Sequence, residues 1–222
     1  MNELKIIDVK ESIFDANNKE ADELRAELRE KKIFMINLMS SPGAGKTTLL
    51  TAVIDRLKDK LKIGVMEADI DAQIDAERIQ RAGARSIQLH TGGMCHMDAG
   101  MTRQGLEAFD IADLDLLILE NVGNLVCPAE FDTGAHENVM LLSVPEGDDK
   151  PLKYPLIFQV SNLVIVTKID TKSVFDFNEE AVVQRIHGRN PNAEVLFLSA
   201  KTGEGLDAFC SWLLKKTEEF RV

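Results

Sequence analysis

Short apolar runs alternate along this chain with longer segments in which apolar residues recur every three or four positions. The run at 31–41 (KKIFMINLMSS) has the length and composition of a buried strand in a parallel sheet. The segment 47–61 predicts a helix, because five large aliphatic side chains share one of its faces: Leu49, Leu50, Val53, Ile54 and Leu57.

The alternation continues to the C-terminus and predicts the fold class. Apolar runs predict further strands at 62–68, 84–90, 115–122, 138–144, 162–170 and 193–201. Amphipathic patterns predict helices at 3–30, 74–84, 179–188 and 205–220, whereas 123–137 and 145–158 are expected to be long irregular loops. Strands alternating with helices indicate an α/β fold, a mostly parallel sheet flanked by helices on both faces.

Composition and charge narrow the class of protein. Of the 222 residues, 45% are hydrophobic and 28% are charged, which is typical of a globular domain. The N-terminus is charged and no apolar run reaches the ~18 residues that cross a bilayer, so we expect a cytoplasmic protein without membrane association. The net charge of −11 disfavours nucleic-acid binding, and three cysteines disfavour a disulfide framework.

A phosphate-binding motif follows the first predicted strand. Residues 40–47 (SSPGAGKT) match the P-loop pattern G-x-x-x-x-G-K-S/T except at Ser40, where the pattern has Gly. We expect backbone N–H groups to bind phosphates, Lys46 to reach the β and γ phosphates, and the Thr47 hydroxyl to bind Mg²⁺. The predicted nucleotide-binding residues here are Pro42, Gly43, Ala44, Gly45, Lys46, Thr47 and Thr48. The alternative, a glycine-rich turn without a ligand, is disfavoured by Lys46 and Thr47.

Two later segments predict that the nucleotide is GTP rather than ATP. Thr167-Lys168-Ile169-Asp170 resembles the N-K-x-D signature of GTPases, with Thr in place of Asn. The Asp170 carboxylate can accept hydrogen bonds from N1–H and N2–H₂ of guanine, donors that adenine lacks, while Lys168 can cover the purine face. The third base-binding loop of GTPases is matched by Ser199, Ala200 and Lys201. The Thr167 substitution leaves one loop-bracing hydrogen bond in question and does not affect the choice of base.

Acidic residues after two other strands are candidates for Mg²⁺ binding and catalysis. Residues 120–123 (ENVG) resemble the D-x-x-G switch of GTPases, so Glu120 can hold Mg²⁺ and Gly123 can present an amide to the γ-phosphate. Asp69 is the preferred further Mg²⁺ ligand, and Asp75 is the second candidate, for the metal or the attacking water. The predicted catalytic residues are therefore Lys46, Asp75, Glu120 and Gly123. The alternatives are a carboxylate that caps a strand and, at Asp75, a solvated helix N-terminus.

Cys95, His96 and Cys127 are candidate ligands of a second metal. Thiolates and imidazole suit Zn²⁺ or Ni²⁺, and three ligands instead of four indicate an open site or one completed by another subunit. Cys127 lies four residues after Gly123, so a switch that responds to the γ-phosphate could move a ligand. Two loop cysteines and an exposed histidine without metal are an equally good interpretation of the chemistry alone, and Cys210 has the spacing of a core residue.

Five segments, in this order, resemble the nickel-insertion GTPases of hydrogenase maturation (the HypB type), relatives of the urease accessory GTPase: SSPGAGKTT, GGMCHMDA, ENVGNLVCPAEFDTG, EGDDKPLKYP and TKID. The resemblance begins near residue 8 and extends to the C-terminus. It implies a P-loop NTPase with a SIMIBI-type G domain at residues 31–222, after an N-terminal helical extension at residues 1–30.

The resemblance also implies a function and partners, and it favours the metal-binding interpretation. It implies a homodimer that depends on GTP, on metal or on both, with Ni²⁺ or Zn²⁺ bound at the interface by Cys95, His96 and Cys127. It implies slow GTP hydrolysis and nickel delivery to the large-subunit precursor of a nickel–iron hydrogenase, with a small zinc-containing accessory protein as partner. Ser40, Thr167 and Ala68 depart from the family pattern, and four scattered histidines do not indicate nickel storage.

Three rival functions are weighed against this one. A small-molecule P-loop kinase would need a basic lid, which is not evident here, and a non-enzymatic metal carrier would not need Lys46 and Thr47. A urease-type nickel-insertion GTPase shares the chemistry but delivers to another acceptor.

No arginine finger is evident in the sequence, which predicts a slow intrinsic rate of GTP hydrolysis.

Overall fold

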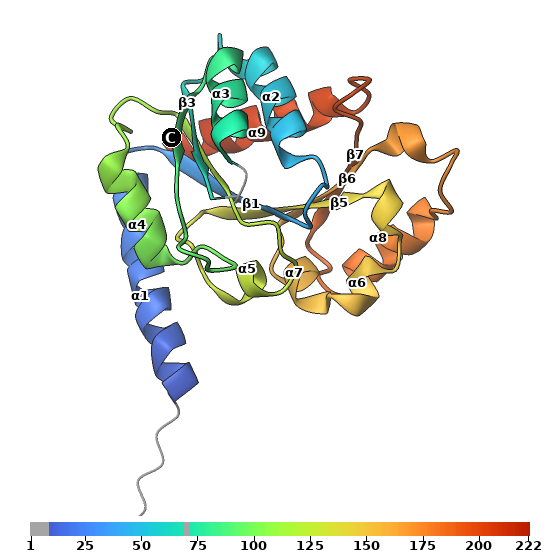
Figure 1. The fold of residues 1–222 in the computed structure, drawn as a ribbon, viewed down its shortest axis with the longest axis horizontal. Helices are drawn as coiled ribbons and strands as arrows, with labels where there is room; N and C mark the ends of the chain where they lie inside the picture. Colours follow the sequence, from blue (N-terminus) through green and yellow to red (C-terminus); the bar gives the residue numbers. More distant parts are fainter. Residues whose placement is uncertain (1–8, 69–71) are drawn as a thin grey trace, which may run out of the picture.

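A seven-stranded parallel sheet forms the centre of the described part of the molecule, as the apolar runs predict (Figure 1). A computed structural model describes residues 9–68 and 72–222 of the protein. The strand order is β3-β2-β4-β1-β5-β6-β7, which places β1 in the middle. The strands are β1 (Phe34–Ser40), β2 (Ile63–Glu67), β3 (Arg85–Gln88), β4 (Leu116–Glu120), β5 (Glu137–Ser143), β6 (Leu163–Thr167) and β7 (Glu194–Phe197).

Helices cover both faces of this sheet. One face carries α2 (Lys46–Leu57), α3 (Ala72–Ala82) and α9 (Leu206–Arg221) (Figure 1). The opposite face carries α1 (Val9–Glu30), α4 (Ala99–Ala108), α5 (Cys127–Glu130), α6 (Lys150–Lys153), α7 (Pro155–Gln159) and α8 (Glu179–His187). Two short 3₁₀ turns, η1 (Val144–Glu146) and η2 (Ile169–Thr171), follow β5 and β6.

The side chains of β1 show why five of its seven residues are apolar, with Asn37 and Ser40 as the polar exceptions. Phe34, Ile36 and Leu38 belong to the core under α2 and α9, whereas Met35 and Met39 point to the other face. Successive strand residues alternate between the two faces, and both faces are covered by helices. A strand buried on both sides therefore needs apolar residues at consecutive positions.

Helix α1 packs against the sheet through its apolar stripe. Leu24 and Leu28 are each 1% exposed and belong to one core cluster with Met35 of β1 and Leu117 of β4. Figure 1 shows α1 running beside α4 along one side of the molecule. None of the described helices, α1 included, combines the length and apolarity that crossing a bilayer requires.

The structure corrects the predicted loops at 123–137 and 145–158. The first contains the single turn α5, and the second contains η1, α6 and α7, which have prolines in their first turns. Helix α4 has no counterpart in the sequence prediction, because three of its four buried positions are the small residues Ala99, Thr102 and Gly105. Small residues give little hydrophobic periodicity, yet they let a helix approach its neighbours closely.

The predicted strand at 162–170 ends early, at Thr167. Lys168 has φ 59°, a left-handed conformation that a β-strand does not continue through. The turn that follows brings Asp170 back towards the loop after β1. The carboxyl ends of the strands thus bring the predicted nucleotide-binding loops together, as expected for a parallel α/β sheet.

Candidate functional site

The P-loop connects β1 to α2. Its backbone reverses at Gly43 (φ 74°) and Gly45 (φ 102°), positions where a side chain would be strained. Ser40 is the last residue of β1 and lies in extended backbone, so the Gly of the family pattern is not needed there. Helix α2 begins at Lys46, which directs its N-terminal amides and the positive end of its dipole into the loop.

Lys46 and Thr47 are both held by contacts with neighbouring side chains. Lys46 is only 5% exposed, and its Nζ donates to the Ser40 Oγ over 3.2 Å. The Thr47 hydroxyl lies 3.3 Å from Oε1 of Glu120, the last residue of β4. A hydroxyl beside a buried carboxylate offers the hard oxygen ligands that Mg²⁺ prefers, so this donor set fits the ion.

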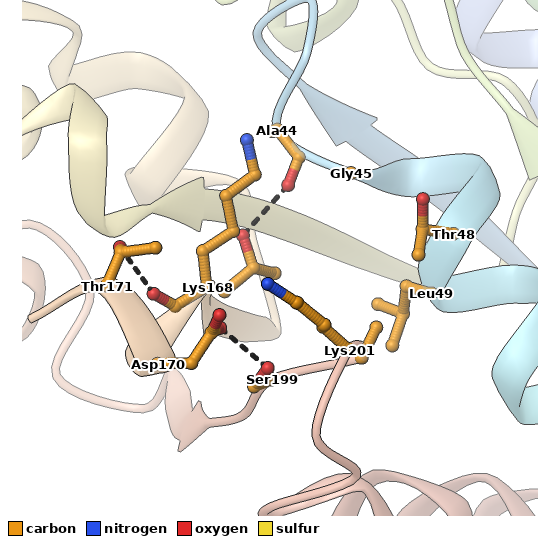
Figure 2. A pocket seen from close by; sticks show the side chains of 11 residues that line it. Ala44, Gly45, Thr48, Leu49, Lys168, Asp170, Thr171, Ser199 and Lys201 are labelled. Atoms are coloured by element: carbon orange, nitrogen blue, oxygen red, sulfur yellow. Dashed lines mark hydrogen bonds between the residues drawn. The ribbon is translucent and has the colours of Figure 1, made fainter.

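A cavity of about 260 Å³ lies beside the P-loop (Figure 2). Asp170 and Ser199 lie on one side of it, and Thr48 and Leu49 of α2 lie on the other. Its remaining lining residues are Ala44, Gly45, Thr167, Lys168, Thr171, Ala200 and Lys201. The cavity therefore gathers residues of the P-loop and of both predicted base-binding loops.

Hydrogen bonds fix the two base-binding loops. The Ser199 hydroxyl donates to Oδ1 of Asp170 over 2.6 Å, which orients the carboxylate. The Lys168 Nζ donates to the Gly43 carbonyl over 2.7 Å, so its stem crosses the space next to the P-loop. The buried Thr167 hydroxyl donates to the Ala44 carbonyl over 2.9 Å. The loop-bracing hydrogen bond left in question by the Thr167 substitution is therefore present.

The switch-like segment after β4 lies against the P-loop. A Cβ added to Gly123 would lie 3.2 Å from the backbone N and Cα of Pro42, so only glycine fits this contact comfortably. Glu67 ends β2, pairs in register with Glu120, and is 1% exposed. Glu67 is not among the predicted site residues, although a carboxylate at the end of an otherwise uncharged strand marks it as a candidate.

The two remaining acidic candidates cannot be placed in this way. Asp69 lies outside the described residues. Asp75 falls within α3, and its side chain lies outside the described part of the structure. Their assignments to Mg²⁺ and to the attacking water remain predictions.

Cys95, His96 and Cys127 converge within one chain. Their candidate ligand atoms all lie within 4.8 Å of one another, although Cys127 is 32 residues from Cys95 in the sequence. The Cys95 and Cys127 sulfurs are 2.8 Å apart, and Cys95 Sγ is 3.9 Å from Nδ1 of His96. A tetrahedral metal with bonds of about 2.3 Å to sulfur holds two sulfurs about 3.7 Å apart. The two sulfurs would therefore have to move apart by only ~1 Å to bind the ion.

The surroundings of His96 contradict the exposed histidine of the metal-free interpretation. Its side chain is 5% exposed, and its ring stacks on Phe131 with centroids 3.9 Å apart. Burial lowers the pKa of His96, against the opposing charges of Asp98 and Glu130, and so favours the neutral imidazole that binds metals. The pKa of Cys127 is raised, first by its contact with Cys95 and second by burial. A bound cation would reverse this shift and favour the thiolates.

A buried amide connects the switch segment to the metal segment. Asn121 is 0% exposed, and its Oδ1 accepts from the Met97 N–H over 3.1 Å, next to His96. Its Nδ2 donates to Oδ1 of Asn37 on β1 over 3.0 Å. Asn121 also follows Glu120 directly, so one buried residue connects the carboxylate near the P-loop to the segment that carries His96.

Comparisons with known proteins find a matching family and relatives of similar length and fold. The family profile described as "CobW/HypB/UreG, nucleotide-binding domain" matches residues 34–197. Hydrogenase maturation factor HypB of Escherichia coli (strain K12) is 41% identical over 213 residues, covering 96% of this chain and 73% of the relative. Hydrogenase/urease maturation factor HypB of Helicobacter pylori (strain ATCC 700392 / 26695) is 38% identical, covering 97% of this chain and 90% of the relative. The crystal structure of HypB from Helicobacter pylori in complex with nickel superposes with a TM-score of 0.87 and 38% identity, covering 92% of this chain and 96% of that one.

Proposed function

The chain belongs to the CobW/HypB/UreG family of nucleotide-binding proteins, and we propose that it is a GTP-hydrolysing metallochaperone that binds nickel and delivers it during maturation of a nickel–iron hydrogenase. One observation carries this proposal: the two thiols and the imidazole converge in a chain whose P-loop has both Lys46 and Thr47. The name of the Escherichia coli relative supports the hydrogenase, and the nickel complex of the Helicobacter pylori protein supports the metal.

The nucleotide is hydrolysed at the P-loop. Thr47 and Glu120, with Asp69, would hold Mg²⁺, and the bound ion would supply positive charge to the β and γ phosphates. Lys46 adds a positive charge, Gly123 presents its amide to the γ-phosphate, and Asp75 orients the attacking water. Water attacks the γ-phosphorus, the bond to the β–γ bridging oxygen breaks, and GDP and phosphate leave. Hydrolysis by the isolated chain is slow, because catalysis awaits charge from a second subunit or a partner.

The bound nucleotide controls how tightly the three ligands bind the metal. Loss of the γ-phosphate removes the group to which the Gly123 amide would donate, and Cys127 lies four residues further along the same segment. Asn121 carries the same displacement to Met97, which adjoins His96. A segment ordered by the γ-phosphate and released on hydrolysis is a known type of nucleotide switch.

A metal site with three ligands from this chain suits an ion that is later transferred to another protein. Three ligands leave a fourth position for a group from a second copy of the chain or from a receiving protein. The proposed partners are a second copy in a homodimer, a small zinc-containing accessory protein and the hydrogenase large-subunit precursor. The donor set binds Zn²⁺ as well as Ni²⁺, so selectivity for nickel comes from supply and from the partner.

The test is nickel binding by competition with a chelator, with GDP and with a nonhydrolysable GTP analogue, together with the oligomeric mass. We expect the nickel affinity of the wild type to differ between the two nucleotides and to be lost in Cys127→Ser. Cys210→Ala is the matched control, because Cys210 lies in α9, packed in the core under α2 and α9. Nickel affinity that is the same in every nucleotide state and in Cys127→Ser would overturn the metal half of the proposal.

Hydrolysis is tested separately. Lys46→Ala is expected to abolish GTP hydrolysis, and the phosphate released by the wild type is expected to appear as free phosphate. Transfer of the phosphate to an added small molecule would instead support the kinase. The Helicobacter pylori relative is named for both hydrogenase and urease, so a urease apoprotein is the second acceptor to offer the loaded chain.

A further inference from the structure

The metal ligands lie on two segments that no β-ladder joins directly. Cys95 and His96 precede α4, whereas Cys127 begins α5. Along the chain, α4, strand β4 and the switch-like segment separate the two. For three ligand atoms to lie within 4.8 Å of one another, these segments must be held together by side chains. The N-terminal helix α1, outside the predicted GTPase domain, contributes such side chains.

Asn17 of α1 contacts both metal-bearing segments through a single amide group. Its Oδ1 accepts from the Ala99 N–H over 3.0 Å, three residues after His96. Its Nδ2 donates to the Asp132 carbonyl over 3.0 Å, five residues after Cys127. The Asn17 side chain is buried at 9% exposure and Ala99 at 0%, so water competes poorly for these hydrogen bonds.

An aromatic column follows the same path. Phe14, one turn before Asn17, packs on Phe131 with ring centroids 5.1 Å apart. Phe131 in turn stacks on the imidazole of His96 at 3.9 Å, with the ring planes 15° apart. Phe131 directly follows α5 and so belongs to the Cys127 segment, whereas His96 belongs to the segment before α4. The stacked rings therefore connect α1 to the same two segments that the Asn17 amide connects. It also fixes the orientation of the His96 ring.

Further contacts hold α1 against the segment after α5. Arg25 pairs with the Asp132 carboxylate, and its Nε donates to the Ala135 carbonyl over 3.1 Å. A Cβ at Gly134, where φ is 79°, would lie 2.7 Å from Leu24 Cδ2, so glycine permits this close approach. These contacts anchor α1 to the segment that carries Cys127, so its Asn17 amide can hold the other segment against it.

From these contacts we propose that α1 is a structural part of the nickel site, with Asn17 as the positioning residue that ties the Cys95–His96 segment to the Cys127 segment. The proposal rests on the nickel-binding function proposed above and assigns a role to a helix that the sequence placed outside the GTPase domain. Groups that hold metal ligands in place typically change metal affinity by about 10- to 100-fold when they are removed. A pre-organised set of ligands releases its metal slowly, because all three must separate for release.

The experiment measures the rate of nickel release from the full-length GDP-bound protein into excess chelator, with the thiolate-to-nickel absorption band as a second readout. Asn17→Ala removes both hydrogen bonds. Asn17→Asp keeps the acceptor for Ala99 N–H and loses the donor to the Asp132 carbonyl, which cuts the tie at one end. We expect each variant to release nickel about tenfold faster or more, with a shifted absorption band.

Two controls separate positioning from general stability. Glu27→Gln weakens an ion pair between α1 and Arg103 of α4, 3.1 Å apart, without touching either metal segment. It is expected to release nickel at the wild-type rate, and urea unfolding compares its stability with that of the Asn17 variants. Phe131→Leu tests the aromatic column independently and is expected to speed release.

The outcomes distinguish the two proposals. If Cys127→Ser fails to weaken nickel binding, the nickel function itself falls. If Cys127→Ser loses nickel while both Asn17 variants keep the wild-type release rate and absorption band, Asn17 only stabilises the fold and the positioning role is overturned. Release from Glu27→Gln as fast as from Asn17→Ala would likewise overturn the specific role of Asn17.

Discussion

His136 links α1 to the sheet, and its burial predicts a pH dependence of stability. Its Nδ1 accepts from the Met35 N–H over 3.0 Å, which occupies the nitrogen that a second proton would need. The ring lies against Phe34 and Phe220, with centroids 5.9 and 4.2 Å away. Burial, with the charges of the two α1 arginines at positions 25 and 29, lowers the pKa of His136 from 6.5 to about 4.

The sign of the effect follows from which state binds the proton first. As the pH falls below 6.5, the unfolded chain protonates His136 while the folded chain does not until about pH 4. The free energy of unfolding therefore falls across this window, by roughly 1.4 kcal/mol per pH unit and ~3 kcal/mol in total. Above pH 6.5 both states carry the neutral ring, and this contribution to stability is fully present.

Urea unfolding of the GDP-bound protein between pH 5 and 7.5 measures this slope. His136→Gln is less stable at every pH, because it loses the ring contacts, but its slope is expected to be shallower than that of the wild type by about 1 kcal/mol per pH unit below pH 6. His90→Gln, at an exposed histidine, is the control substitution. Equal slopes in the wild type and His136→Gln would refute the reasoning.

Two further predictions concern the base site. Asp170→Asn is expected to weaken GTP binding by about 100-fold and to favour xanthosine triphosphate, because an amide no longer accepts from both guanine donors. Competition with a fluorescent nucleotide measures both affinities. Asp176→Asn, at an exposed acid in the next loop, is the control. Thr167→Val leaves the Ala44 carbonyl without its 2.9 Å hydrogen bond, so GDP affinity is expected to fall by about tenfold. Thr167→Ser keeps the hydroxyl and is expected to bind GDP like the wild type, and a Val variant with unchanged affinity would show that this brace is not needed.

The parts of the fold and site that the sequence predicted are those encoded locally. Consecutive apolar residues mark a strand covered on both faces, and the motifs around Lys46, Asp170 and Gly123 each sit where such a strand ends. Parallel strands bring their carboxyl ends to one edge of the sheet, so recognising the strands was enough to bring the loops together. The cavity beside the P-loop was therefore largely predictable.

The parts that were missed depend on contacts between distant segments. Helix α4 buries Ala99, Thr102 and Gly105, which carry little apolar signal. Nothing near Asn17 in the sequence indicates that its amide reaches both metal segments, since the partners lie 82 and 115 residues away. Spacing alone also left open whether the metal ligands meet in one chain or across two, because that depends on how the segments fold back.

The closeness of the two sulfurs also has a consequence for redox chemistry. Cys95 and Cys127 lie 2.8 Å apart, and Cys95 is exposed, so a shift of under ~1 Å would reach the length of a disulfide bond, about 2.05 Å. A two-electron oxidant such as hydrogen peroxide would join them with loss of both thiol protons, and the oxidised pair offers nickel no thiolate. Cargo and oxidant thus compete for the same two atoms. In peroxide, we expect the thiols of the nickel-loaded protein to be oxidised more slowly than those of the metal-free protein. The metal-free protein is expected to need a reducing environment to remain able to bind nickel.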